Sequence, residues 1–191
     1  MMRLNYVTSN RVKFEEAQII LASPNIELIH SHIHLDELQG TPKSIIEHKV
    51  IQAFNLLNEA VIVDDVSVSL EALHGLPGPY IRPFLEALGD DGFWDLVKRY
   101  ENRRISATCS IAYMHSKNLT PLFFDGTVHG TVVEPRGATR HGPHSWNAFT
   151  QPDGSEKTMA QMSLEEMSRI SPRGNALRQL KNYLLTHPEA L

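Results

Sequence analysis

The sequence has a single cysteine, no long hydrophobic run and no excess of positive charge. Cys109 has no second cysteine to pair with, so a disulfide within the chain is excluded and the cytoplasm is the expected compartment. No segment approaches the length that spans a bilayer, and the first ten residues lack an apolar signal core. The net charge of −4 gives no electrostatic footprint for duplex nucleic acid. We therefore expect neither a membrane nor a nucleic acid as partner.

The length and composition are those of an ordinary soluble globular protein. The chain has 191 residues, of which 41% are hydrophobic and 21% charged. This composition excludes disordered and collagen-like classes. The length predicts one domain over residues 1–191, built as a single core or as two intimate lobes.

The stretch from residue 60 to residue 80 organises the rest of the chain. The apolar run Val61–Val63 predicts a short buried strand that ends in two carboxylates, Asp64 and Asp65. The segment Gly75–Pro79 combines two glycines with two prolines and predicts a sharp turn. Acids at a strand end beside a rigid turn suit a divalent cation held against a phosphorylated ligand.

A strand over Leu4–Val7 is followed by a polar turn and a helix for which Asn10 is the expected N-cap. The helix-start amides, the hydroxyls of Thr8 and Ser9 and the ammonium of Lys13 together can bind a phosphate. An ordinary capped helix with Lys13 in solvent fits the same residues, and on this segment alone it is the favoured interpretation.

A second strand is predicted over Ile26–Ile33, with His30, His32 and His34 alternating onto one face. Three histidines at this spacing can bind a metal, but no further soft ligand or hydrogen-bonding partner is predicted nearby. A solvent-facing strand surface is therefore the favoured interpretation.

Thr41 and Pro42 predict the start of a helix whose apolar stripe holds Ile46, Val50, Ala53, Phe54 and Leu57. Lys49 falls at the edge of this stripe. Its side chain either extends into solvent or reaches toward the acids of the following strand.

The middle of the chain predicts two helices, Ile81–Leu88 and Asp91–Tyr100, and then two long strands. The strands cover residues 105–114 and 122–134, and a polar turn around Lys117–Asn118 joins them into a hairpin. Gly126 and Gly130 predict a bulge or a strong twist in the second strand.

Residues 135–154 form a long segment rich in glycine, proline, histidine and arginine, and loops of this length are usually functional. Trp146 within it suits either stacking on a ring or ordinary packing. Ser163 begins a short helix with capping-box spacing, and Arg173 lies in the first turn of the last helix. A cation at that end opposes the helix dipole, so Arg173 favours a partner anion or a contact with a base.

Taken together, these segments resemble the inosine/xanthosine triphosphate pyrophosphatases, the house-cleaning nucleotide hydrolases, and more closely their eukaryotic-type members. The resemblance covers nearly the whole chain and rests on TSNRVKFEE, DELQGTP, VDDVSVSLEALHGLPGPYI, FDGTVHGTVVEPRG, FTQPDGSEKTMAQMSLEE and SPRGNAL. It implies an α/β fold with an elongated mixed β-sheet flanked by helices, two lobes and a central active-site cleft. It also implies a homodimer that hydrolyses ITP, dITP and XTP to the monophosphate and pyrophosphate, with Mg²⁺ (or Mn²⁺) as cofactor.

The resemblance assigns the phosphate contacts residue by residue. Thr8, Ser9, Asn10 and Lys13 would bind the triphosphate, and Lys49 would reach the same phosphates. Lysines there neutralise the charge that develops during cleavage between the α and β phosphates.

The metal contacts follow from the same resemblance. Glu37 and Asp65 would hold magnesium, and Asp64 or Asp65 would orient the attacking water. Two adjacent acids also raise the chance that one of them has a shifted pKa suited to a general base.

The base-recognition segments depart from the family pattern. Trp146 keeps the family's aromatic, but Asn147 replaces an aspartate, Met167 a lysine and Pro172 a histidine, while Arg173 is retained. Asparagine can donate as well as accept, so we expect an altered or relaxed base preference.

Two alternatives remain open. One is a catalytically weak or silent nucleotide-binding protein derived from this family. The other is a new ligand or metal contact made by His141 and His144, although loop histidines are more often solvated.

Overall fold

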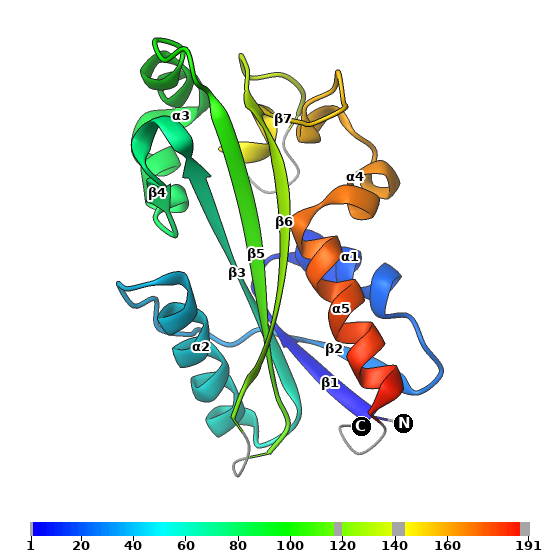
Figure 1. The fold of residues 1–191 in the computed structure, drawn as a ribbon. Helices are drawn as coiled ribbons and strands as arrows, with labels where there is room; N and C mark the ends of the chain where they lie inside the picture. The colour runs from blue at the N-terminus through cyan, green and yellow to red at the C-terminus, as the bar shows by residue number, and fades with distance from the viewer. Residues whose placement is uncertain (1, 117–119, 139–143, 188–191) are drawn as a thin grey trace. The chain divides into compact units, whose positions relative to one another are not determined.

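The computed structural model describes residues 2–116, 120–138 and 144–187, so the predicted turn at Lys117–Asn118 and His141 lie outside the described residues (Figure 1). The strands are β1 (Met2–Val7), β2 (Ile26–Ser31), β3 (Val61–Leu70), β4 (Pro77–Gly78), β5 (Arg104–Met114), β6 (Leu122–Val132) and β7 (Thr150–Pro152). The α-helices are α1 (Arg11–Leu21), α2 (Pro42–Leu57), α3 (Ile81–Val97), α4 (Leu164–Ile170) and α5 (Pro172–Thr186), with short 3₁₀ turns η1 (Glu71–Leu73), η2 (Trp146–Ala148) and η3 (Met159–Gln161).

The strands form one mixed sheet, which confirms the predicted α/β class. Its order is β2-β1-β3-β5-β6-β7, with β4 paired to β3, and it has seven strands among the described residues. β1 pairs in parallel with both β2 and β3, whereas β4 on β3 and β7 on β6 are antiparallel. β1 is thus a central strand whose carboxyl end leads directly into α1.

The chain divides into two compact units. Unit 1 comprises residues 1–65, 109–126 and 172–191, and unit 2 comprises residues 66–108 and 127–171. Each has its own apolar core: unit 1 around Val7, Val50, Phe54, Val63 and Ala112, unit 2 around Val68, Phe93, Val97, Val132 and Phe149. The cleft between two lobes that the resemblance implies stays a prediction.

Helix α2 packs on unit 1 through the predicted apolar stripe. Ile46, Val50, Ala53 and Phe54 are buried, and Thr41 caps the helix by accepting from the Ser44 amide, with Pro42 at its first position. These local predictions are confirmed because capping chemistry and helical periodicity agree with the burial that the strands offer.

Helices α1 and α5 pack side by side (Figure 1). The Lys181 ammonium of α5 donates to the carbonyls of Ile20, at 2.9 Å, and Ala22, at 3.0 Å. Carbonyls at the end of α1 that lack helical partners are thereby satisfied.

The glycines of β6 allow α5 and β7 to pack closely against this strand. A Cβ on Gly126 would lie 2.1 Å from the carbonyl oxygen of Pro172, and one on Gly130 would lie 2.3 Å from that of Gln151. These distances give a packing reason for the two glycines, because α5 and β7 each need a strand position without a side chain; the predicted bulge or strong twist stays a prediction.

Two local predictions need correction. The two predicted helices are one element, α3, interrupted where Gly89 adopts φ 69°, and its second half ends at Val97 rather than at Tyr100. The predicted turn forms, but Pro77 and Gly78 inside it still pair with β3. Within the described residues, no helix combines the length and apolar character needed to cross a membrane.

Candidate active site

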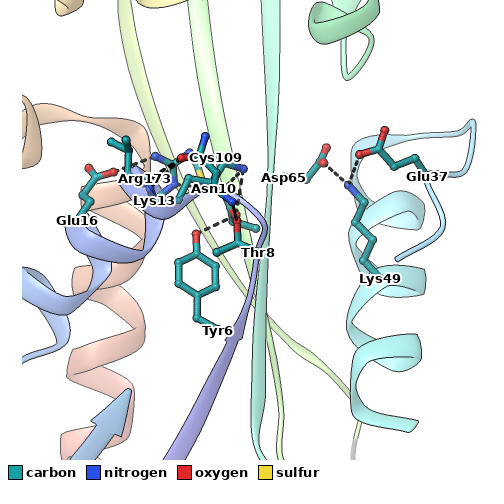
Figure 2. A network of polar contacts seen from close by, with 12 residues as sticks. Tyr6, Thr8, Asn10, Lys13, Glu16, Glu37, Lys49, Asp65, Cys109 and Arg173 are labelled. Atoms are coloured by element: carbon teal, nitrogen blue, oxygen red, sulfur yellow. Dashed lines mark hydrogen bonds and ion pairs between the residues drawn. The ribbon is translucent and has the colours of Figure 1, made fainter. Parts of the chain in front are cut away.

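Asp64 and Asp65 lie in the middle of β3 rather than at the end of a strand, because β3 continues to Leu70. Successive side chains of a strand point to opposite faces, so the two acids separate. Figure 2 shows the consequence within unit 1: Lys13, Arg173 and Glu16 gather on one side of β3, and Lys49 and Glu37 on the other. The single strand-end acid site that the sequence predicted is therefore two sites back to back.

The Asp64 carboxylate is surrounded by donors. The Tyr6 hydroxyl donates to its Oδ1 at 2.8 Å, and the Lys13 ammonium lies 3.2 Å from Oδ1 and 3.0 Å from Oδ2. Nε of Arg173 donates to Oδ2 at 3.1 Å, and the buried Cys109 thiol lies 3.9 Å from the same oxygen. Only 1% of the Asp64 side chain is exposed.

The Arg173 guanidinium joins Asp64 to a second buried acid. Its Nη1 donates to Oε2 of Glu16 at 2.8 Å, and the Glu16 side chain is completely buried. The predicted partner anion of Arg173 is thus a pair of carboxylates from α1 and β3. Sequence analysis did not single out Glu16 or Tyr6. Glu16 had a signal, because it interrupts the apolar face of α1 one turn after Lys13.

Burial and charge act in opposite directions on Asp64. Burial favours the neutral acid, but the charges of Lys13 and Arg173, with hydrogen bonds from Lys13 and Tyr6, outweigh it and hold the pKa of Asp64 well below its usual range. Asp64 is therefore an ionised anchor whose oxygens are already occupied.

Asp65 has fewer partners. The Lys49 ammonium lies 2.8 Å from Oδ1 of Asp65 and 3.9 Å from Oε1 of Glu37, so one cation joins both predicted metal ligands. The side chain of Asp65 is 18% exposed, and that of Glu37 is 63% exposed. Lys49 thus takes the second of its two predicted orientations, toward the acids.

Burial raises the pKa of Asp65, and Lys49 offsets this shift only in part, while the neighbouring charge of Asp64 adds to it. A carboxylate with a raised pKa holds a proton more readily and is the better base of the two.

Gln52 of α2 fixes the backbone one residue before Glu37. Its Oε1 accepts from the Asp36 amide at 2.9 Å, and its Nε2 donates to Oδ2 of Asp36 at 3.0 Å. The segment that carries Glu37 is therefore tied to α2, the helix that carries Lys49.

The polar turn after β1 has the predicted cap but not the predicted free amides. Oδ1 of Asn10 accepts from the amides of Val12, at 3.0 Å, and Lys13, at 3.4 Å. An anion here would therefore meet side-chain donors of Thr8, Ser9 and Lys13 before these two amides. The Ser9 side chain is exposed, and those of Thr8 and Lys13 are partly buried.

The predicted solvent-facing surface holds for His32 and His34, which are exposed, but not for His30. β2 ends at Ser31, and the half-buried His30 ring stacks on Phe14 of α1 with ring centroids 4.4 Å apart. Its Nε2 lies 2.9 Å from the carbonyl oxygen of Thr8.

The predicted base-recognition residues Trp146 and Asn147 lie in η2 of unit 2. Trp146 is partly buried and packs against the apolar core of that unit. Asn147 is 4% exposed, and its Oδ1 is buried without a hydrogen-bond partner among the described residues. His144 lies near Asp90, with Nδ1 and Oδ1 3.8 Å apart.

Two further positions of the predicted base site have structural roles. Met167, where the family has a lysine, is buried in the core of unit 2. Pro172 begins α5 in unit 1, a position where its missing N–H costs nothing.

Comparisons with known proteins agree with this fold. The model of the Ham1 family matches residues 4–183. The inosine triphosphate pyrophosphatase of Yarrowia lipolytica is 38% identical over 188 residues, 98% of this chain and 98% of that protein. That of Pyricularia oryzae is 36% identical over 178 residues, 93% and 91% of the two chains. The structure of a HAM1 protein from Coxiella burnetii matches with a TM-score of 0.85 at 24% identity, covering 97% of this chain and 100% of the other.

Proposed function

The chain belongs to the Ham1 family, and on that premise we propose that it is a magnesium-dependent nucleoside triphosphate pyrophosphatase. Its substrates would be ITP, dITP and XTP, and its products the monophosphate and pyrophosphate. The names of the two fungal relatives support the activity. The observation that carries the proposal is the convergence of Glu37 and Asp65 on the Lys49 ammonium.

The donor set fits Mg²⁺. Glu37 and Asp65 offer hard carboxylate oxygens that already face one cation. Among the described residues there is no group of three or more His, Cys, Asp or Glu side chains that could hold a metal. Two carboxylates with the remaining positions left to water and phosphate suit Mg²⁺, which usually keeps several waters. When bound, the metal would polarise phosphate oxygens and lower the pKa of a water ligand.

The chain's own residues divide the remaining work. Asp65 would orient the water that attacks the α-phosphorus, because the oxygens of Asp64 are occupied. Lys49 and Lys13 would neutralise charge on the leaving pyrophosphate, and Thr8 and Asn10 would donate to the phosphates.

The test is a panel of ITP, dITP, XTP, GTP, ATP and pyrimidine triphosphates with Mg²⁺, with monophosphate and pyrophosphate quantified separately. Asp65→Asn should reduce kcat by about 10²–10⁴-fold, because it removes a group that holds the metal and positions the attacking water. Asp95→Asn, an exposed acid on α3, is the control and should keep wild-type turnover. Tight nucleotide binding without product would contradict the proposal and favour the silent binding protein. Full activity in Asp65→Asn would remove Asp65 from the mechanism.

We further propose that Asn147 relaxes the base preference. Its amide can donate to a 6-keto group or accept from a 6-amino group, and its Oδ1 has no protein partner in the described structure. In Asn147→Asp the side-chain carboxylate can only accept hydrogen bonds. The ratio of kcat/KM for ITP to that for ATP should therefore change by about tenfold or more. An unchanged ratio would contradict a role in base selection.

A homodimer is the proposed assembly. Three large apolar side chains stay exposed around β4 and α3 in unit 2, namely Leu76, Tyr80 and Leu88. Light scattering should give twice the mass of the chain, and Leu76→Asp should shift the protein toward the monomer.

A further inference from the structure

We propose that His30 is a positioning residue that holds the turn Thr8–Asn10 in the shape that binds phosphate. The inference rests on the proposed function and deepens it, because it names a residue outside the phosphate contacts on which they depend. Three contacts of the His30 ring carry it.

The first contact fixes the Thr8 peptide. The Thr8 amide donates to the Ser31 carbonyl at 3.2 Å, and the Thr8 carbonyl oxygen lies 2.9 Å from Nε2 of His30. A carbonyl can only accept, so Nε2 carries the proton and donates. The two peptide groups that flank the Cα of Thr8 are therefore each held by β2, the first through backbone and the second through the His30 ring.

The second contact ties the same ring to α1. His30 and Phe14 stack with an interplanar angle of 10° and centroids 4.4 Å apart. Phe14 follows Lys13 and its amide donates to the carbonyl of Asn10 at 3.3 Å. One imidazole thus contacts both ends of the segment between Thr8 and the first turn of α1.

The third contact keeps the ring in its tautomer. Nε2 of His32 lies 3.2 Å from Nδ1 of His30. With the proton of the His30 ring on Nε2, Nδ1 accepts and His32 donates to it. The hydrogen bonds then run in one direction, from exposed His32 to half-buried His30 and on to the Thr8 carbonyl.

These contacts stiffen a segment that would otherwise lose conformational freedom when an anion binds. Within it, the Thr8 hydroxyl oxygen accepts from the Asn10 amide at 3.2 Å, so the orientation of the Thr8 peptide is passed to the N-cap. Preorganisation of this kind lowers the cost of binding. His30 touches no reacting atom in this arrangement, so its effect should fall on phosphate affinity and not on the chemical step.

Three variants separate the contacts. His30→Phe keeps an aromatic ring for Phe14 but removes the donor to Thr8. His30→Gln keeps a donor of similar reach but removes the ring. His32→Ala leaves the contacts of His30 with Thr8 and Phe14, and removes the donor to Nδ1 together with the ring contact at 4.0 Å between centroids.

For each variant we would measure kcat and KM for ITP, inhibition by pyrophosphate, and hydrogen exchange of the amides of residues 8–13. His30→Phe should raise KM and the pyrophosphate inhibition constant by about tenfold, the effect of one lost hydrogen bond, with kcat within about twofold. Exchange of these amides should accelerate. His30→Gln should recover most of the affinity, and His32→Ala should have the smaller effect.

Wild-type KM, inhibition and exchange in His30→Phe would overturn the inference, and so would a fall in kcat at unchanged KM. A wild-type protein that hydrolyses no nucleotide would contradict the proposed function instead. Hydrogen exchange requires no turnover, so unchanged exchange in His30→Phe would still refute the positioning role in that case.

Discussion

Each face of β3 in unit 1 carries an aspartate, but the pKa values of the two carboxyl groups shift in opposite directions. Asp64 is 1% exposed, accepts from Tyr6 and contacts two cations, and its pKa is lowered. Asp65 is 18% exposed, contacts one lysine, and its pKa is raised. Adjacent residues of identical chemistry thus become an anchor and a group available for reaction. The difference lies in the helices that pack on each face, not in the acids.

The largest loss of stability is expected when Arg173, on the Asp64 face, is replaced. Arg173→Met would leave Glu16 and Asp64 buried without their shared cation, and loss of one partner of a buried pair costs about 3–5 kcal/mol. Chemical denaturation measures this loss in the free energy of unfolding. Arg178→Met, an exposed arginine on the same helix, should stay within about 0.5 kcal/mol. Addition of Glu16→Gln should restore part of the stability. A loss below about 1 kcal/mol for Arg173→Met would mean that water compensates the acids.

A smaller loss of stability on the Asp64 face is expected from a substitution in β6. Gly126→Ala places a Cβ 2.1 Å from the Pro172 carbonyl oxygen and 2.6 Å from the Ala176 amide nitrogen, both backbone atoms that cannot turn aside. We expect α5 to shift and the free energy of unfolding to fall by about 1–3 kcal/mol. Gly92→Ala in helix α3, where the nearest atom is the side-chain Cβ of Leu88 at 3.3 Å, should be neutral or slightly stabilising. Equal effects at the two positions would contradict the close approach.

The Asp65 face should lose less stability than the Asp64 face when its cation is removed. Lys49→Met is expected to lower the free energy of unfolding by about 1–3 kcal/mol, less than Arg173→Met, because Asp65 and Glu37 are more exposed than Asp64 and Glu16. Turnover of ITP should fall about 10²-fold or more, because Lys49 would neutralise charge in the transition state. Lys43→Met, on the same helix, is the matched control and should change neither quantity markedly. A loss of stability in Lys49→Met as large as that in Arg173→Met would make the two faces alike.

The smallest expected effect is a change in the stability of Asp65→Asn, relative to wild type, with pH. The raised pKa of Asp65 means that the folded protein binds this proton more tightly than the unfolded chain, so Asp65 stabilises the fold at low pH and loses that contribution as pH rises through its folded-state pKa. Asp65→Asn removes the effect. The stability of the variant relative to wild type should therefore increase as pH rises above about 4, where an ordinary aspartate is already ionised. A difference that stays constant with pH would show that Asp65 titrates normally.

Asp64 has the opposite sign. Its lowered pKa stabilises the fold above the unfolded-state value and is lost only as pH falls through the folded-state value. Acid denaturation of the wild type should therefore remain in Asp65→Asn, which separates the two carboxylates in one titration.

Local signals in the sequence predicted the parts of the site that local chemistry decides. Asn10 and Thr41 cap their helices as expected, and Lys49 lies where the apolar stripe of α2 meets β3. Each depends on residues within a turn or two of the chain.

Parts of the site that depend on distant pairing were not predictable. The apolar run Val61–Val63 gave no sign that β3 continues beyond the acids, because that extension depends on pairing with strands elsewhere in the chain. Arg173 and Glu16 are 157 residues apart, and no spacing rule connects them. Gly126 was identified as unusual, but its reason is a helix turn some fifty residues later in the chain.

The contact of Glu16 and Asp64 with Arg173 also has a consequence for biosynthesis. Asp64 and Arg173 are 109 residues apart, so at about 5–20 residues per second a ribosome adds the arginine roughly 5–20 seconds after the aspartate. During that interval the nascent chain holds two acids whose shared cation does not yet exist. All of unit 2, residues 66–108 and 127–171, is synthesised before Arg173. Unit 2 is thus complete in sequence before unit 1 receives the residue that joins Glu16 to Asp64.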